Sequence, residues 1–277
     1  DDPQGVPALR SAIADYVRRS RSVHCTPEQV IVTSGTQQGL YLSCQVLLDA
    51  DDLAWVEDPA YRGITGILES TGHRRGMVHV PVDEAGMDVE AGRAMAERAR
   101  VAFVTPSHQY PLGMPLTMAR RNALLAWARA NGSWIVEDDY DSEFRFEGRP
   151  LASLQGLDEH DRVIYMGTFS KTLFPGIRMG FMVLPKPLAP HFAIGLSELF
   201  REGQLIQQAV LADFIEEGHY ATHIRRVRLR YAQRQSLLRE AIAERFGANW
   251  PTSTHEAGLH LVMHLPPGAD DLGISMA

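Results

Sequence analysis

One lysine of the sequence lies where a reactive amine would be expected. Lys171 occupies the segment 168–172 (TFSKT), directly after the apolar run 163–166, which is predicted to be a buried strand. The carboxyl end of such a strand is where open α/β sheets bind ligands. A lysine that is desolvated there can lose its proton and attack an aldehyde, although a lone lysine is more often a solvated surface charge. Arg178, which follows Pro175-Gly176, could reach the same crevice and clamp a phosphate.

A run of acidic residues follows a second apolar segment. Glu137-Asp138-Asp139-Tyr140-Asp141 comes directly after the strand-like 134–136. Neighbouring carboxylates repel one another unless a cation or a hydrogen-bond donor lies among them, and a metal ion or a protonated ring nitrogen would serve. Taken in isolation, the run is more typical of a solvated acidic turn.

A third candidate site lies between a strand and a helix. Ser34-Gly35-Thr36-Gln37 separates the β-branched run 30–33 from the helical pattern 37–48. The backbone N–H groups at such a helix N-terminus can cradle a phosphate, although a simple N-cap is the commoner role of these residue types. The segment matches neither the Rossmann nor the Walker glycine motif.

Together the three segments supply what pyridoxal 5′-phosphate needs. Its aldehyde needs a lysine, its phosphate needs amides and an arginine, and its pyridinium nitrogen needs a carboxylate so that the ring can act as an electron sink. The sequence therefore predicts a pyridoxal 5′-phosphate site built at strand ends.

The elements that must position these residues alternate between strands and helices. This alternation predicts an α/β fold with a mostly parallel sheet and helices on both faces. The predicted helices cover 6–18, 37–48, 61–70, 118–131 and 222–246, and the predicted strands 30–33, 53–57, 75–80, 101–105, 134–136 and 163–166.

The character of the chain changes after residue 196, where long helices replace the alternation. A break at 247–254 leads to 259–265, where apolar residues alternate in the period of a strand. We therefore predict a large domain, 1–246, and the beginning of a smaller, incomplete C-terminal domain, 247–277.

Composition excludes several classes of protein. The 277 residues include 27 Lys and Arg against 34 Asp and Glu, a net charge of −7, which is not that of a strongly basic nucleic-acid binder. No apolar run is long enough to span a membrane, and residues 1–5 lack the features of a signal peptide, so we expect a cytoplasmic protein. Cys25 and Cys44 are too few for a disulfide scaffold and are expected to be buried thiols.

Because the chain lacks an initiator Met, we expect it to be part of a longer protein.

Four motifs resemble those of fold-type I pyridoxal-phosphate enzymes of aminotransferase class I/II. They are TSGTQQG (33–39), EDPAY (57–61), EDDYDSEFR (137–145) and GTFSKTLFPGIR (167–178), and the resemblance spans essentially the whole chain. The acidic motif, with TPSHQ (105–109) and GRPL (148–151), is more narrowly similar to the MocR branch of GntR regulators. In that branch an aminotransferase-like domain is fused behind a DNA-binding winged helix-turn-helix.

The resemblance implies a role for nine residues. Lys171 would form the internal aldimine, Asp138 would pair with the pyridine nitrogen, and Tyr140 would hydrogen-bond the phenolic oxygen of the ring. Asp138 is preferred to Asp139 because a spacing of two places it on the same side of a continuing strand as Tyr140. Tyr61 would stack on the ring. The phosphate would be held by Gly35, Thr36, Gln37, Thr168 and Arg178.

The sequence also departs from the family pattern. Ordinary aminotransferases carry Asn-Pro-Thr-Gly, whose Asn touches the ring oxygen, whereas this chain has Tyr110-Pro111-Leu112-Gly113 preceded by Gln109. The resemblance places the arginine for the substrate carboxylate in the small domain beyond Ala277, and a tyrosine that reaches the neighbouring subunit's phosphate just before Asp1.

A group of histidines and a run of arginines predict neither a metal site nor a DNA-binding surface. His260 and His264, with His255 nearby, suggest a metal site, but four residues on a strand span about 13 Å, so no metal site is predicted. The arginines of the last long helix interleave with apolar residues at helical spacing, which favours a solvated helix face over DNA contact. These arginines are 225, 226, 228, 230, 234 and 239.

Two functions remain open. The preferred one is the effector domain of a MocR-like regulator, which binds pyridoxal phosphate, senses an amine or amino acid, and contacts DNA only through an N-terminal domain that this chain lacks. The alternative is a metabolic aminotransferase with a full ping-pong cycle, so whether the protein is an enzyme stays undecided. The resemblance implies a homodimer in either case.

Overall fold

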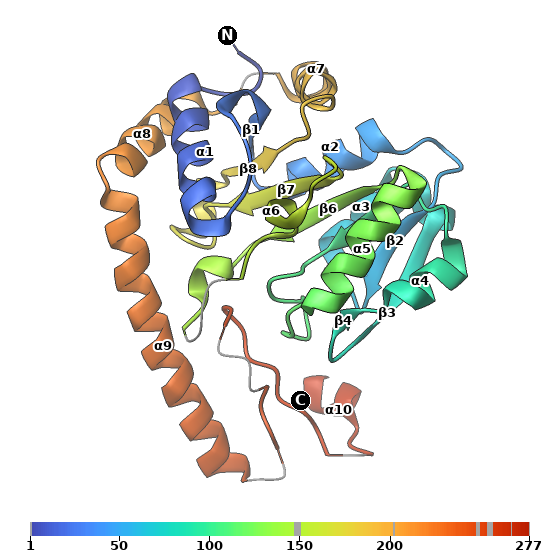
Figure 1. Ribbon diagram of the computed structural model, residues 1–277. Coiled ribbons are helices and arrows are strands. Elements are labelled where there is room, and N and C mark those ends of the chain that lie inside the picture. Colours follow the sequence, from blue (N-terminus) through green and yellow to red (C-terminus); the bar gives the residue numbers. More distant parts are fainter. Residues whose placement is uncertain are drawn as a thin grey trace.

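A single sheet of eight strands organises the protein (Figure 1). The computed structural model describes residues 2–146, 151–201, 203–247, 250–253, 257–266 and 268–276. The strands are β1 (Val30–Thr33), β2 (Ala54–Asp58), β3 (Met77–Asp83), β4 (Gly86–Met87), β5 (Val101–Val104), β6 (Trp134–Asp139), β7 (Val163–Thr168) and β8 (Gly180–Val183).

The strand order is β1-β8-β7-β6-β5-β2-β3-β4. The pairs β7–β6, β6–β5, β5–β2 and β2–β3 are parallel, whereas β8 runs antiparallel to both of its neighbours and β4 is antiparallel to β3. The prediction of a mostly parallel α/β sheet is therefore confirmed. Because β1 and the parallel strands point the same way, their carboxyl ends share one edge of the sheet.

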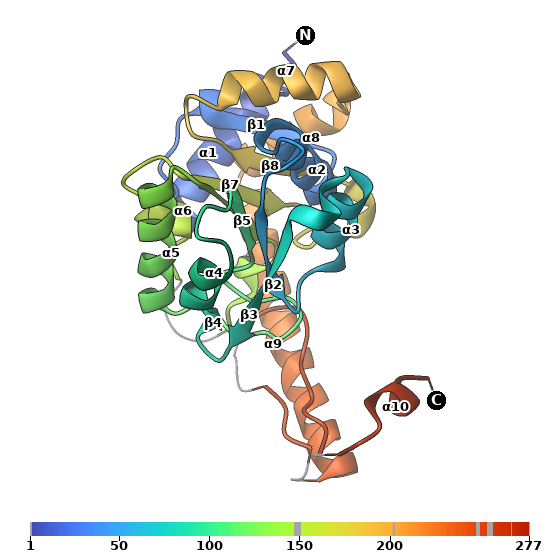
Figure 2. The ribbon, with the colours of Figure 1, turned by 90° about the vertical axis from the view of Figure 1, so that its right-hand side faces the viewer.

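Helices cover both faces of the sheet, as Figure 2 shows for α4 and α5 on one side and α2 and α3 on the other. The helices are α1 (Pro7–Arg21), α2 (Thr36–Leu47), α3 (Arg62–Ser70), α4 (Val89–Ala96), α5 (Met118–Asn131), α6 (Leu154–Leu157), α7 (Ala189–Phe200), α8 (Leu205–Glu216), α9 (His219–Phe246) and α10 (Asp271–Met276).

The core is divided by the sheet because successive strand side chains point to opposite faces. On β2, Val56 packs under α2, α3 and α7, whereas Trp55 packs on the other face among α4 and α5. There Trp55 stacks on Trp127 with ring centroids 3.9 Å apart and donates its indole N–H to Ala96. On that same face α1, α8 and the beginning of α9 cover the other end of the sheet. Both cysteines are buried and free, as expected.

The sequence predicted most of these elements to within a few residues, but two differences matter. Strand β6 extends through Asp139, three residues beyond the predicted 134–136, so the first three acidic residues lie on the strand and not in a turn. The predicted strand 259–265 is wrong: within the described residues this segment makes one isolated bridge, from Met263 to Thr252. Alternation alone does not form a strand, because a strand needs a partner along its length.

The long helix α9 extends away from the sheet, and the segment that follows it runs back alongside (Figure 1). Arg225, Arg226, Arg228 and Arg230 are exposed on it, as expected for a solvated face. The division into domains 1–246 and 247–277 stays a prediction, and the GRP part of GRPL and His255 lie outside the described residues.

Candidate active site

A cavity of about 250 Å³ opens at the shared carboxyl edge of the sheet. Its walls come from the segments that follow β1, β2, β5, β6 and β7. The nine residues singled out from the sequence all line it, although they come from distant parts of the chain. The lining residues are Gly35, Thr36, Gln37, Tyr61, Thr105, Tyr110, Asp138, Tyr140, Thr168, Ser170, Lys171, Pro175 and Arg178.

One end of the cavity is suited to an anion. Gly35, with φ +87°, precedes α2 and provides no side-chain cap, so the first N–H groups of this helix are uncapped where its first residues line the cavity. The Ser34 N–H is already used, because it donates to Gln38 Oε1 at 2.7 Å. Arg178 adds a positive charge to the same wall, and within the described part of the chain no carboxylate forms an ion pair with it.

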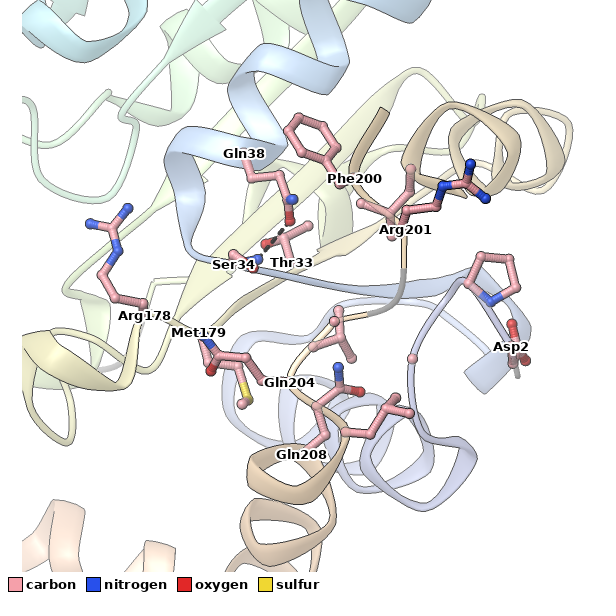
Figure 3. Close-up of a pocket in the computed structure, with 16 residues that line it drawn as sticks. Asp2, Thr33, Ser34, Gln38, Arg178, Met179, Phe200, Arg201, Gln204 and Gln208 are labelled. Carbon is pink, nitrogen blue, oxygen red and sulfur yellow. Dashed lines mark hydrogen bonds between the residues drawn. The ribbon is translucent and has the colours of Figure 1, made fainter. Parts of the chain in front are cut away.

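A second, smaller cavity of about 40 Å³ lies on the other side of this turn. Figure 3 shows the Ser34–Gln38 hydrogen bond at its wall and the Arg178 side chain pointing away from Gln204 and Gln208. The guanidinium group is thus directed away from the interior of the smaller cavity.

Asp138 is a buried acid with an unused acceptor. Its side-chain Oδ1 has no hydrogen-bond partner, and only 8% of the residue is exposed. Burial, followed by the charges of Asp139, Asp141 and Glu57, raises the pKa of Asp138 to about 7, against a smaller lowering by Lys171. A cationic N–H at this point would satisfy Oδ1 and restore the ionised form. This unused acceptor therefore fits the N–H of a protonated pyridine ring.

The two other buried acids of β6 have structural partners. Glu137 accepts the N–H groups of Leu154 and Gln155 at 2.8 and 3.0 Å, which caps α6. Asp139 forms an ion pair with Arg21 at 2.7 Å. The interpretation of the run as a solvated acidic turn is therefore wrong. Consecutive residues of a strand face opposite ways, so the adjacent carboxylates have different surroundings.

Lys171 lies in the loop after β7 and is exposed to the cavity. The desolvation expected from its place after a buried strand is therefore not provided by this chain, because the loop carries the residue beyond the buried strand end. Its access to the cavity leaves it free to reach a bound aldehyde.

Three tyrosine rings form the aromatic part of the wall. Tyr110 packs edge-on against Tyr61, with centroids 5.6 Å apart, and against Tyr140, at 6.1 Å. The Tyr61 hydroxyl accepts a hydrogen bond from Gln37 Nε2 at 2.8 Å. The Gln37 side chain is thus held by Tyr61, and its backbone N–H stays available to an anion.

The residues in place of Asn-Pro-Thr-Gly divide between core and cavity. Gln109 is buried and donates to the carbonyl of Pro59 at 2.8 Å, so it does not take the role of the usual Asn. Tyr110 lines the cavity instead. Four lining residues were not predicted from the sequence: Thr105, Tyr110, Ser170 and Pro175. For Tyr110, its place at the position of the usual Asn was the available signal.

The sheet, the strand-end cavity and its donor set define the fold-type I class of pyridoxal-phosphate-dependent proteins. The family model of aminotransferase class I and II matches residues 1–275, and the chain belongs to this family.

Two proteins with similar sequences are transcription regulators. The chain is 46% identical over 268 residues to the probable rhizopine catabolism regulatory protein MocR of Rhizobium meliloti, covering 96% of this chain and 53% of that protein. It is 36% identical over 260 residues to the pyridoxine biosynthesis transcriptional regulator PdxR of Corynebacterium glutamicum, covering 94% and 55%. The chain thus spans about half the length of these relatives.

Among solved structures, the kynurenine aminotransferase of Pyrococcus horikoshii, in complex with PMP, superposes with a TM-score of 0.89. It is 28% identical to this chain, and the match covers 99% of this chain and 69% of that one. In the part of the chain that the structure describes, no helix is long and apolar enough to cross a membrane.

Proposed function

We propose that this chain is the sensor domain of a MocR-type transcription regulator, which holds pyridoxal 5′-phosphate and detects an amino compound. The observation that carries the proposal is the cavity at the carboxyl edge of the sheet, lined by all nine residues, in a chain 46% identical to a MocR regulator. Its unpaired carboxylate oxygen, uncapped helix N-terminus and accessible lysine match the nitrogen, phosphate and aldehyde of that cofactor.

Different residues of the cavity would bind different groups of the cofactor. The amides of Gly35, Thr36 and Gln37, with Thr168 and Arg178, would hold the phosphate, because a helix N-terminus and a guanidinium both bind anions. Asp138 would keep the ring nitrogen protonated, and Tyr61 would cover the ring. When bound, pyridoxal phosphate supplies an aldehyde that condenses with a primary amine and a ring that withdraws electrons.

Lys171 would provide the first amine, and an incoming amino compound would compete with it. Displacing Lys171 changes which groups occupy the cavity next to Tyr61 and Tyr110. We propose that this change is passed to a DNA-binding domain elsewhere in the protein. Such a protein would act on DNA in the cytoplasm, and we propose that it works as a homodimer, as the fold typically does.

The cofactor proposal is tested by labelling. Lys171 and Lys186 are the only lysines of the sequence, so borohydride reduction in the presence of pyridoxal phosphate has two candidate targets. We expect peptide mapping to find the pyridoxyl group on Lys171. Lys186→Arg should leave the label and the visible absorbance unchanged, and Lys171→Arg should abolish both. Equal labelling of the two lysines, or none, would refute the proposal.

A metabolic aminotransferase is the second candidate, supported by the likeness to the kynurenine aminotransferase structure and by the complete set of nine residues. The two functions differ in turnover. A regulator should show a spectral change with an amine and altered binding of the complete protein to its operator DNA. An enzyme should convert many equivalents of amino acid to keto acid when a keto-acid acceptor is supplied.

A further inference from the structure

Behind Tyr140, away from the cavity, lies a buried histidine that the proposed function does not use. His108 belongs to the loop between β5 and α5, and only 4% of it is exposed. Its Nδ1 lies 3.0 Å from the Tyr140 hydroxyl and 3.0 Å from Asp141 Oδ2. One ring nitrogen thus connects a cavity tyrosine to a carboxylate that does not line the cavity.

The Asp141 carboxylate determines which of His108 Nδ1 and the Tyr140 hydroxyl donates a hydrogen bond to the other. An ionised carboxylate only accepts hydrogen bonds, and Asp141 Oδ2 already accepts the N–H of Leu259 at 3.0 Å. The contact with Asp141 therefore requires a proton on His108 Nδ1. That same N–H also faces the Tyr140 oxygen, which must then accept, so the hydroxyl hydrogen of Tyr140 turns toward the cavity.

We propose that Asp141 and His108 are positioning residues that fix the direction of the Tyr140 hydroxyl hydrogen, so that Tyr140 donates to the ring oxygen of the cofactor. This inference rests on the proposed function for the identity of the acceptor. The orientation itself follows from Asp141, His108 and Tyr140.

The surroundings hold the His108 ring closely in place. A Cβ on Gly258, where φ is +85°, would lie 1.9 Å from His108 Cε1, and one on Gly113 would lie 3.3 Å from Nε2. His260 packs on the ring with centroids 4.5 Å apart. Only glycine fits at Gly258, since both the contact and the backbone angle exclude a side chain.

The charged and titratable groups around the ring come from several elements. Asp141 and Tyr140 follow β6, and His260 comes from the C-terminal segment. Arg21 and Arg145 line a small cavity that His108 also lines. Burial, and next the neighbouring His108, lower the pKa of His260, which favours its neutral form near neutral pH. Arg21 is already paired with Asp139.

A metal ion is the competing explanation, because ligand atoms of His108, Asp141 and His260 lie within 4.8 Å of one another. Hydrogen bonds already engage these groups: His260 Nε2 lies 3.1 Å from the carbonyl of Pro111, and His108 Nδ1 faces Asp141. A carbonyl only accepts, so Nε2 carries a proton there and is not free to bind a metal. The network thus accounts for the cluster without an ion.

The test compares two substitutions of one residue in the complete protein. Asp141→Asn removes the charge but keeps an oxygen that accepts from Nδ1, whereas Asp141→Ala removes the acceptor. In Asp141→Ala, Nδ1 is expected to lose its proton and accept from Tyr140, which withdraws the hydroxyl hydrogen from the cavity. Histidine ring nitrogen NMR without cofactor should show Nδ1–H for His108 in the parent and in Asp141→Asn, and Nε2–H in Asp141→Ala.

With cofactor bound, the absorbance is titrated against pH. A hydrogen bond to the ring oxygen makes the nitrogen that links the cofactor to Lys171 less basic. In Asp141→Ala the hydrogen bond from Tyr140 to the ring oxygen should be lost. The pKa of the nitrogen that links the cofactor to Lys171 should then rise by about one unit, the size expected for one hydrogen bond. Loss of the negative charge alone shifts this pKa downward, so Asp141→Asn should show no rise. In a Tyr140→Phe or a His108→Phe background, Asp141→Ala should cause no further rise in this pKa, because the hydroxyl is then absent or no longer faces a histidine.

Several results would overturn the inference. They are an unchanged His108 tautomer in Asp141→Ala, equal chromophore pKa values in the two Asp141 variants, or a stoichiometric metal ion that is lost in His260→Phe. His264→Phe, at an exposed histidine, is the matched control for the last. A parent protein that binds no cofactor would refute the proposed function, while the NMR result would still decide the orientation of Tyr140.

Discussion

The buried ion pair between Arg21 and Asp139 gives a prediction whose size follows from the structure. Arg21 lies in the last turn of α1 and is 5% exposed, and Asp139 ends β6 and is 3% exposed. The guanidinium donates to Asp139 Oδ2 at 2.7 Å, to the Leu151 carbonyl at 2.6 Å and to Ser107 Oγ at 2.7 Å. It therefore links α1 to the end of β6 and to the loops that contain Ser107 and Leu151.

Replacing Arg21 by Met leaves the Asp139 charge buried without its cation. Breaking a buried pair from one side costs about 3–5 kcal/mol, because the remaining charge keeps its desolvation penalty. Tyr165 and Ser142 still donate to Asp139 Oδ2, at 2.7 and 2.9 Å, so we expect a loss near the lower end, about 3 kcal/mol. Arg18→Met, on the same helix, should cost less than about 1 kcal/mol, because Arg18 and its partner Asp15 are about half exposed.

The assay is urea denaturation of the cofactor-free protein, followed by circular dichroism. Adding Asp139→Asn to Arg21→Met removes the uncompensated charge, so the double variant should be at least as stable as Arg21→Met alone. If the two single losses simply add, or if Arg21→Met costs no more than Arg18→Met, the argument from buried charge fails.

Three further predictions concern the acid, the glycine and the core. The folded-state pKa of Asp138, at about 7, lies above its unfolded value of about 4, so the folded state binds more protons in this window and loses stability as pH rises through it. Asp138→Asn should therefore flatten the fall in the melting temperature of the cofactor-free protein between about pH 4 and pH 7, and an unchanged slope would contradict the assignment. Gly258→Ala should displace His108 and lower the melting temperature by several degrees, as about 1 kcal/mol or more would, whereas Gly132→Ala has a similar φ but open space around it and should cost only its backbone strain. Trp127→Ala should cost about 3–5 kcal/mol in urea denaturation because the ring stacks on buried Trp55, and a loss below 1 kcal/mol would show that this stack does not stabilise the fold.

Much of the candidate site could be predicted because its residues lie in short segments next to strand ends. Lys171 follows β7, Gly35 follows β1 and Tyr140 follows β6, and the carboxyl ends of strands that point the same way meet at one edge. Local patterns of apolar and turn-forming residues were enough to locate these ends to within a few residues. Motif similarity then assigned chemistry to the positions.

His108 shows what such patterns leave out. Nothing in the sequence around His108 indicates that Asp141 and Gly258, 33 and 150 positions away, enclose it. The same limit applies to 259–265, whose alternation predicted a strand while the structure provides only the bridge to Thr252.

The sequence by itself determined the α/β class, the family and the strand-end segments that carry the reactive groups, because these depend on periodicity and on residues close together in the chain. Only the tertiary structure decided which of the adjacent acids is free. Glu137 caps a helix and Asp139 pairs with Arg21, whereas Asp138 lines the cavity and has an oxygen without a hydrogen-bond partner. The reason is physical: burial and hydrogen bonding set the state of a carboxylate, and both depend on which distant segments pack against it.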